Sequence, residues 1–212
     1  MDLEILDINV DVDKLRSSLK SIQRKYPFPY EPFREGYGGW SIQSEVENGS
    51  YDDGWTVGTS MKMRNIQQSV KRTNTNIHEY NKKTDCCIEY FDELLNKFDQ
   101  LGFMTSRARV AYMGPDRELS LHRDVPPNIY RCRIHIPIFT NYNCWHILYD
   151  QDGVKEIDRV HLQVGNAYMF KVNNFHKAVN WGEQDRYHFV MNGFDSHQIT
   201  RLNKFDPNVN LV

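Results

Sequence analysis

The sequence predicts a mainly β fold, a sandwich or barrel, with a helical and loop-rich layer packed on it. Beyond Gly102, apolar and polar residues alternate with a period of two in short runs that turns separate. No helical segment lies between these runs, so we expect antiparallel pairing rather than a parallel α/β sheet. Before Gly102, two segments repeat their apolar residues at helical spacing instead. A chain of 212 residues is long enough to bury the core of one such domain.

Two amphipathic helices are expected in the first half of the chain. Residues 11–25 carry acidic side chains at the start and basic ones at the end, as the helix dipole prefers. Residues 86–101 form the second apolar repeat, and Gly102 ends it. The segment between them, 27–59, is rich in Pro, Gly and aromatic residues, which indicates packed loops and short strands.

The second half is expected to consist of short strands closed by turns. We therefore expect a single domain, with the helical layer over 1–105, a β core over 106–195 and a C-terminal tail over 196–212. The predicted strands are 107–113, 130–140, 144–150, 160–164, 166–172 and 186–195.

Composition limits the function. With 26 Lys and Arg against 28 Asp and Glu, the formal charge is -2, so no overall field attracts nucleic acid. No apolar run approaches the roughly 18–20 residues that a membrane-spanning helix needs. The acidic N-terminus lacks the pattern of a secretory signal, which predicts a cytoplasmic location. The four cysteines, at 86, 87, 132 and 144, are accordingly expected to be reduced and mostly buried.

The first candidate for chemistry is the pair His122 and Asp124. In an extended chain, residues two apart point to the same side, so an imidazole and a carboxylate here could hold one cation. A surface His and Asp beside the Pro126-Pro127 turn is the alternative. The predicted strand that follows places Arg131, Arg133 and His135 on one face. Such a face needs either an anionic partner or solvent.

A second histidine, His176, would complete a metal site. Two imidazoles and one carboxylate cap one side of an octahedral ion and leave the other side open, which suits non-haem Fe(II) and O2. Arg186, ten residues after His176, would then offer a charged fork to the far carboxylate of a dicarboxylic co-substrate.

Taken together, these residues resemble the aspartyl/asparaginyl β-hydroxylase-like family of Fe(II)- and 2-oxoglutarate-dependent oxygenases. The resemblance covers about residues 106–195. It rests on the combination rather than on any one part, because each short motif alone occurs by chance. The residues that carry it are His122, Asp124, Arg131, Cys132, Arg133, Ile134, His135, Gly165, Phe170, His176, Asn180 and Arg186.

The resemblance implies a double-stranded β-helix, a cupin-like jelly roll, and a hydroxylase that couples decarboxylation of 2-oxoglutarate to succinate with insertion of oxygen from O2. Its iron ligands would be His122, Asp124 and His176. Arg186 would bind the distal carboxylate of 2-oxoglutarate, and Arg133 and His135 would line the same pocket.

One departure from the family pattern bears on the substrate, and a second bears on the co-substrate. Animal members have glycine where Asp124 stands, whereas small bacterial enzymes keep the carboxylate, so the resemblance implies a small molecule such as an amino acid. A filled ligand position also argues against halogenation. The serine that assists co-substrate binding in animal members has no counterpart near Val110 or Ala111.

The sequence leaves alternatives open. A peptidyl Asp or Asn side chain could be the substrate, or the fold could be a cupin-type protein with a non-redox metal. The candidates for contact with substrate are Trp40, Gln43, Arg131 and Trp145, with Arg34 and Trp55 beside them, and a role in packing is the alternative for each. A structural or surface role is expected for His146, His161, His188 and His197.

Overall fold

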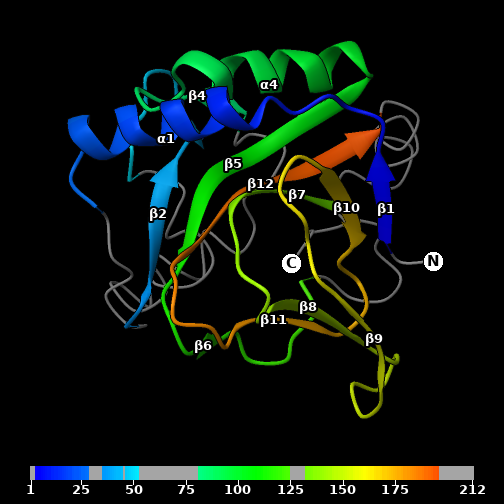
Figure 1. The fold of residues 1–212 in the computed structure, drawn as a ribbon. Helices are drawn as coiled ribbons and strands as arrows, with labels where there is room; N and C mark the ends of the chain where they lie inside the picture. Colours follow the sequence, from blue (N-terminus) through cyan, green and yellow to red (C-terminus); the bar gives the residue numbers. More distant parts are fainter. Residues whose placement is uncertain (1–2, 29–34, 45, 53–80, 125–131, 196–212) are drawn as a thin grey trace, which may run out of the picture.

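Two antiparallel sheets face each other in the computed structural model, which describes residues 3–28, 35–44, 46–52, 81–124 and 132–195 (Figure 1). The larger has six strands, in the order β1 (Leu3–Leu6), β10 (Ala167–Lys171), β7 (Cys132–Phe139), β12 (Arg186–Asp195), β5 (Phe103–Met113) and β2 (Tyr37–Ser41). The smaller has four, in the order β6 (Arg117–Glu118), β11 (His176–Asn180), β8 (Cys144–Tyr149) and β9 (Glu156–Val160). A short pair, β3 (Gln43–Ser44) and β4 (Lys82–Lys83), is separate.

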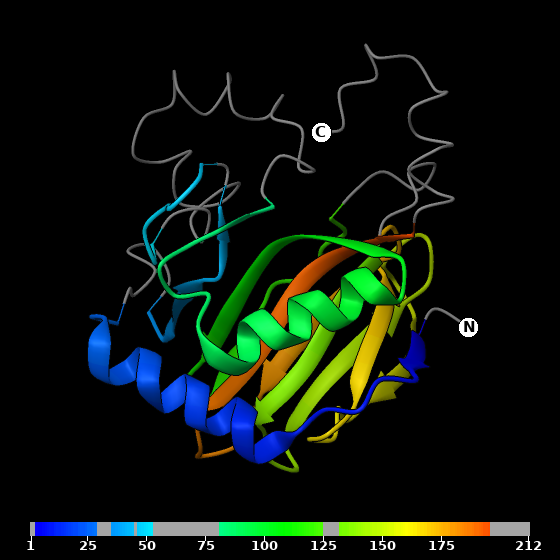
Figure 2. The same cartoon turned by 90° about the horizontal axis from the view of Figure 1, so that it is seen from above.

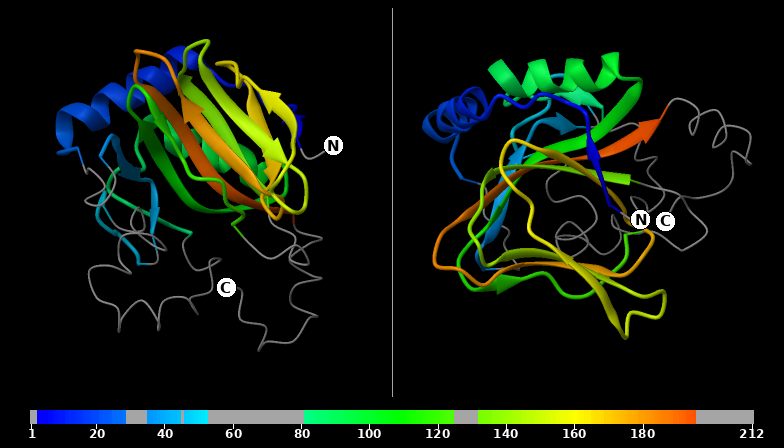
Figure 3. Two further views of the ribbon diagram at one scale, coloured as in Figure 1. Left: turned by 90° about the horizontal axis from the view of Figure 1, so that it is seen from below. Right: turned by 45° about the vertical axis from the view of Figure 1, so that its right-hand side comes forward.

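The chain alternates between the two sheets. From β5 it passes to β6 in the smaller sheet, back to β7, and again to β8 and β9. Strand β10 returns to the larger sheet, and β11 lies in the smaller one. Strand β12 then lies in the larger sheet, between β7 and β5. Figure 3 shows the two sheets as the walls of a flattened barrel. This alternation is the jelly roll, or double-stranded β-helix, that the family resemblance implied.

Two helices, α1 (Val12–Lys25) and α4 (Glu89–Gln100), cover the outer face of the larger sheet (Figure 2). Both carry an apolar stripe because their hydrophobic residues recur at helical spacing. The stripe residues are fully buried against the sheet, and their removal from water supplies the main stabilisation of this layer. They are Leu15, Leu19 and Ile22 of α1 and Phe91, Leu94 and Phe98 of α4, packed on Ala108, Val110, Ile134, Ile136 and Phe189.

The side chains between these core residues point into the barrel. Successive residues of a strand face opposite sides, so Ile134 and Ile136 beneath the helices place Arg133 and His135 on the inner face. On β12, Phe189 lies in the helix-facing core, which places His188 inside. The larger sheet therefore lines the interior with nitrogen-bearing side chains, although its outer face is apolar.

The helices and most strands lie where the sequence predicted them. The prediction of a strand over 160–164 was wrong, because only Val160 of that range belongs to a strand. The strand of this region is β9, which ends at Val160 and whose side chains are mostly exposed, so it lacks the alternating burial that the prediction used. After it, the chain forms a loop in which the backbone N–H of Gln163 donates to the Tyr168 hydroxyl at 2.9 Å. The predicted tail, 196–212, lies outside the described residues.

All four cysteines are free thiols, as expected. Cys86, Cys132 and Cys144 are buried, and Cys87 is partly buried. Burial raises the pKa of Cys86 above its usual value, so this thiol is unreactive. Across the described part of the chain, the structure contains no helix that is both long and apolar enough to cross a membrane. The cytoplasmic location stays a prediction.

The start of α1 provides a test of the helical layer. The Asp11 carboxylate accepts a hydrogen bond from the backbone N–H of Lys14 at 3.0 Å and caps the helix. We expect Asp11→Ala to lower the free energy of unfolding by about 1 kcal/mol. Urea unfolding measures this change. Lys20→Ala, at an exposed position of the same helix, is the control and should leave stability nearly unchanged.

Candidate active site

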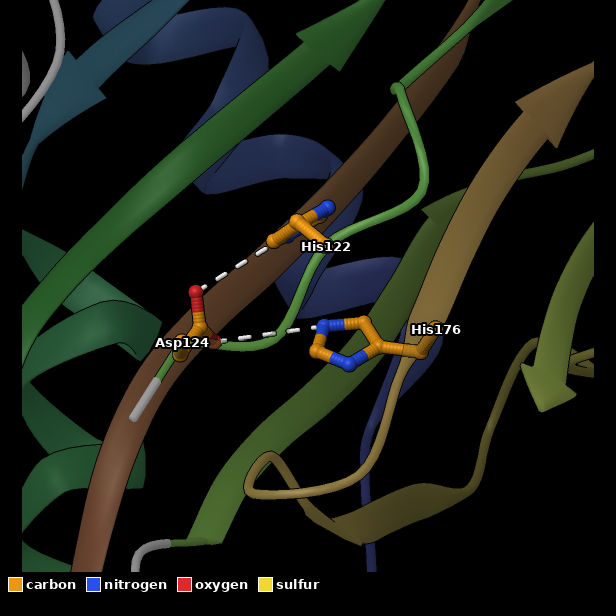
Figure 4. Close-up of side chains that lie close together, drawn as sticks. All are labelled: His122, Asp124 and His176. Carbon is orange, nitrogen blue, oxygen red and sulfur yellow. Dashed lines mark ion pairs between the residues drawn. The ribbon is translucent and has the colours of Figure 1, made fainter. Parts of the chain in front are cut away.

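Three predicted side chains meet at one end of the barrel (Figure 4). His122 and Asp124 lie on the segment between β6 and β7, and His176 begins β11. The two histidines are joined by backbone hydrogen bonds in both directions, at 3.1 and 2.8 Å. Oδ1 of Asp124 lies 3.8 Å from Nε2 of His122, and Oδ2 of Asp124 lies 4.0 Å from Nε2 of His176. One ligand atom from each residue lies within 4.8 Å of the others, which is close enough to share one ion.

Backbone carbonyls orient both imidazoles. Nδ1 of His122 lies 2.7 Å from the carbonyl oxygen of Ser120, and Nδ1 of His176 lies 2.9 Å from that of Asn174. A carbonyl oxygen only accepts, so each Nδ1 carries the hydrogen and each neutral Nε2 keeps a lone pair. This is the arrangement in which a histidine binds a metal through Nε2. The loop conformation before each histidine therefore sets its tautomer.

Asp124 is held as a carboxylate. Its backbone N–H donates to the carbonyl of Val172 at 3.0 Å, and its Oδ2 forms an ion pair with Nη1 of Arg133 at 2.9 Å. Burial alone would raise the pKa of Asp124, but the charge of Arg133, aided by His176, lowers it to about 2. The ion pair does not have hydrogen-bond geometry, so the buried Oδ2 accepts no hydrogen bond within the described residues. That oxygen remains able to bind a cation.

His176 is neutral at physiological pH. Burial lowers its pKa, Asp124 raises it only in part, and the resulting pKa is about 4. Two imidazole nitrogens and one ionised carboxylate form the donor set that Fe(II) prefers when it must keep open positions. The residues present therefore fit an iron ion.

A buried guanidinium lies farther inside the barrel. Arg186, at the start of β12, is 6% exposed, and its Nε and Nη2 lie 3.1 and 3.0 Å from the two ring nitrogens of His188. A neutral imidazole has one lone pair, so it can accept from only one of these donors. Burial lowers the pKa of Arg186 to about 10, which still leaves it charged. No carboxylate pairs with it among the described residues, so an anionic ligand would complete its surroundings.

The interior also contains three buried histidines, His135, His146 and His188. The ring of His135 lies 5.5 Å from that of His146 and 5.8 Å from that of His188. Burial is the main cause that lowers the pKa of all three well below the usual value, so all are neutral. Their burial excludes the surface position expected for His146 and His188 as one alternative and is compatible with the other, a structural role. The signal was available for His188, because Arg186 and His188 share a face of one strand.

Trp40 and Gln43, expected near the substrate, lie elsewhere. Trp40 pairs with Val110 across β2 and β5, is 1% exposed in the core beneath the helices, and donates from Nε1 to the carbonyl of Pro27. Gln43 donates to Thr105 and accepts from the backbone N–H of Ala108 at 3.1 Å. Both side chains already have their partners, so their role in packing corrects the expectation.

Trp145 also faces away from the triad. It alternates along β8 with His146, which lies inside, so Trp145 is on the outer face of the smaller sheet. There its ring contacts His161 at 5.8 Å and the guanidinium of Arg159 at 5.9 Å. The expectation that it contacts substrate is therefore corrected as well. The remaining candidates, Arg131, Arg34 and Trp55, lie outside the described residues.

Comparison with solved structures defines the fold class. The chain is similar to an oxidoreductase of the 2OG-Fe(II) oxygenase family from Burkholderia pseudomallei, with 14% identity, 93% of this chain and 85% of that chain covered, and a TM-score of 0.51. It is also similar to a prolyl hydroxylase from Trichoplax adhaerens, solved with a hypoxia inducible factor peptide fragment, with 12% identity, 94% and 86% coverage, and a TM-score of 0.51. These similarities show the jelly-roll fold of this oxygenase class.

The family follows from the sequence match. Residues 41–195 match the aspartyl/asparaginyl beta-hydroxylase family, and the chain belongs to it. It is accordingly a 2-oxoglutarate-dependent hydroxylase whose cofactors are Fe(II) and 2-oxoglutarate. No curated protein matches the sequence.

Proposed function

We propose that the protein hydroxylates an unactivated C–H bond of a small molecule, an amino acid or a derivative of one, at an iron held by His122, Asp124 and His176. The observation that carries the ligand assignment is the meeting of their three donor atoms within 4.8 Å. The carbonyl groups behind both Nδ1 atoms support it, because they leave the Nε2 lone pairs for the metal.

We assign 2-oxoglutarate to the barrel interior. Arg186 binds the distal carboxylate through its planar fork, and the shortage of carboxylates around this buried cation supports the assignment. Arg133 and His135 line the part of the pocket nearer the metal, since Arg133 also pairs with Asp124. The ligand's two negative charges would neutralise the two guanidinium groups.

The residues of the site hold the reactants and exclude water. Bound iron supplies the redox chemistry by which O2, 2-oxoglutarate and a C–H bond give succinate, CO2 and an alcohol, with one oxygen atom in each of succinate and alcohol. His122 and His176 would each contribute an Nε2 lone pair, and Asp124 contributes one negative charge. Burial of His176 and Arg186 keeps bulk water away from the inner part of the pocket.

The choice of a free over a peptidyl substrate rests on Asp124. A third protein ligand matches the pattern of the small-substrate members that the sequence resembles. The peptidyl alternative keeps support from the family's name and from the structural relative that was solved with a peptide. A cupin-type protein with a non-redox metal would retain metal without consuming 2-oxoglutarate, and family membership argues against it.

A turnover screen tests the proposal. Protein loaded with Fe(II) without oxygen is given 2-oxoglutarate, O2 and either free amino acids or peptides that contain Asp or Asn. We expect succinate formation coupled to the gain of one oxygen atom by a free amino acid. Oxygen gain on peptides alone would contradict the small-molecule assignment. Metal retention without any succinate would contradict the oxygenase reaction itself.

Arg186→Lys tests the co-substrate assignment. Lysine keeps the charge but replaces the planar fork by a point donor, so we expect the KM for 2-oxoglutarate to rise about tenfold, equivalent to about 1.4 kcal/mol. Initial rates of succinate formation measure it. Arg24→Lys, an exposed change in α1, is the matched control. An unchanged KM in Arg186→Lys would contradict the role of Arg186.

A further inference from the structure

His146 is a buried side chain without a hydrogen-bond partner. It is 3% exposed, and neither Nδ1 nor Nε2 has a partner among the described residues. A neutral imidazole carries one N–H donor and one lone pair. A buried polar group left unsatisfied costs about 1–3 kcal/mol, so native structures almost always pair such groups. The His146 ring therefore has both nitrogens available for a water molecule or a ligand in this pocket.

The neighbours of His146 suit an anion. Its ring lies 4.0 Å from that of Phe170, 5.5 Å from that of His135 and 5.4 Å from that of His176. These rings shield a ligand from water, and none of them accepts a hydrogen bond from His146 in the structure. The charged groups that act on His146 include the guanidinium groups of Arg186 and Arg133, both cations. The positive charge of Arg186 and Arg133 would therefore attract an anionic hydrogen-bond acceptor to the space beside His146.

His146 also lies between the two ends of the pocket. On one side it stacks on the candidate metal ligand His176, with 18° between the rings. On the other side it contacts His135, which contacts His188, and His188 contacts Arg186. A dicarboxylate that reaches from the metal to Arg186 has to pass this row of imidazoles. His146 belongs to the smaller sheet, whereas Arg133, His135 and Arg186 belong to the larger one.

We propose that His146 is a co-substrate-binding residue, whose ring N–H donates a hydrogen bond to a carboxylate oxygen of 2-oxoglutarate from the wall opposite Arg133 and Arg186. This proposal rests on the proposed function, because it takes the same pocket and the same ligand. It adds a contact from β8, a strand that contributes none of the residues assigned so far. Residues of both sheets would then bind 2-oxoglutarate.

Binding measurements on two variants test the proposal. His146→Phe keeps a ring but removes both nitrogens, and His146→Gln keeps an amide donor. Titration calorimetry gives the Kd of Mn(II), and then the Kd of 2-oxoglutarate for the Mn(II)-loaded protein. His161→Phe is the matched control, since the His161 ring packs on Trp145 at the outer face of the smaller sheet and its Nδ1 bonds the carbonyl of Cys144. Thermal melting of each variant checks its fold.

We expect His146→Phe to weaken 2-oxoglutarate about tenfold, with Mn(II) affinity within about twofold of the parent, and His146→Gln to recover most of the loss. His161→Phe should bind both like the parent. Equal 2-oxoglutarate affinity in His146→Phe and parent would overturn the role of His146 but leave the proposed function intact. A parent protein that binds Mn(II) but no 2-oxoglutarate would overturn both.

A measurement on the unchanged protein covers the case in which His146→Phe does not fold. In the Zn(II)-loaded protein with ¹⁵N-labelled histidine, addition of 2-oxoglutarate should shift a His146 ring nitrogen and slow exchange of its proton. His146→Gln identifies the signal. A His146 signal that does not respond to saturating 2-oxoglutarate would refute the hydrogen bond.

Discussion

Replacing His176 by alanine is expected to reduce succinate formation by more than hundredfold. The change removes one of three ligand atoms and leaves the buried carboxylate of Asp124 with Arg133 and His122 alone. Changes to groups that only orient a ligand already cost about 10–100-fold in metal affinity or activity, so loss of a ligand should exceed that range. Initial rates with saturating Fe(II) and 2-oxoglutarate, together with the Kd of Mn(II), measure the effect.

The adjacent residue provides the control for this prediction. Lys177 points to the other side of β11, where its ammonium pairs with Glu118 at 3.3 Å. Lys177→Ala should keep metal affinity and turnover near those of the parent, because a surface ion pair contributes at most about 1 kcal/mol. Normal succinate formation by His176→Ala would refute the ligand assignment.

The metal-free protein is expected to lose stability steeply on acidification. The folded-state pKa values of His135, His146 and His188 lie well below the usual value, chiefly through burial, and that of His176 is about 4. In the unfolded chain these histidines bind protons below about pH 6.5, whereas in the folded protein they do not until the pH falls through the lower values. The unfolded state therefore binds more protons in that window, and stability falls as pH falls.

The size of this effect follows from the number of groups. Each histidine protonated only in the unfolded chain lowers the free energy of unfolding by about 1.4 kcal/mol per pH unit, so four together lower it by about 5 kcal/mol per pH unit. Urea unfolding of the metal-free protein at closely spaced pH values between about 6.5 and 4 measures the slope. His188→Gln should reduce the slope by one proton. A parent slope of one proton or less would show that these histidines titrate freely in the folded state.

The sequence predicted the triad because its signals are local or occur at fixed offsets. His122 and Asp124 share a side of an extended segment, and Arg186 follows His176 by ten residues, at the start of the next strand. The relative directions of side chains a few residues apart can be predicted from sequence, because the backbone geometry of a strand fixes them. Antiparallel strands and two amphipathic helices were predictable for the same reason, and the structure confirms both.

Three of the four substrate candidates lie away from the triad, whereas Arg131 lies outside the described residues. Trp40, Gln43 and Trp145 are polar-aromatic or amphipathic residues that suit a binding wall and a core equally well. Only the pairing of β2 with β5 decides that Trp40 lies beneath the helices. Likewise, only the orientation of β8 decides that Trp145 faces outward and His146 inward, and a shift of one residue along the strand would exchange them.

By itself, the sequence determined the family and the fold class, because periodicity and a joint motif encode them, and it predicted the three candidate metal ligands. The tertiary structure brings the donor atoms of these ligands within 4.8 Å of one another. The tertiary structure alone decided which imidazoles line the interior. Arg186 and His188 share one strand, but His146 comes from the other sheet and meets His135 only when the two sheets face each other. Strand register between distant segments depends on the packing of the whole core, which no local pattern of residues records.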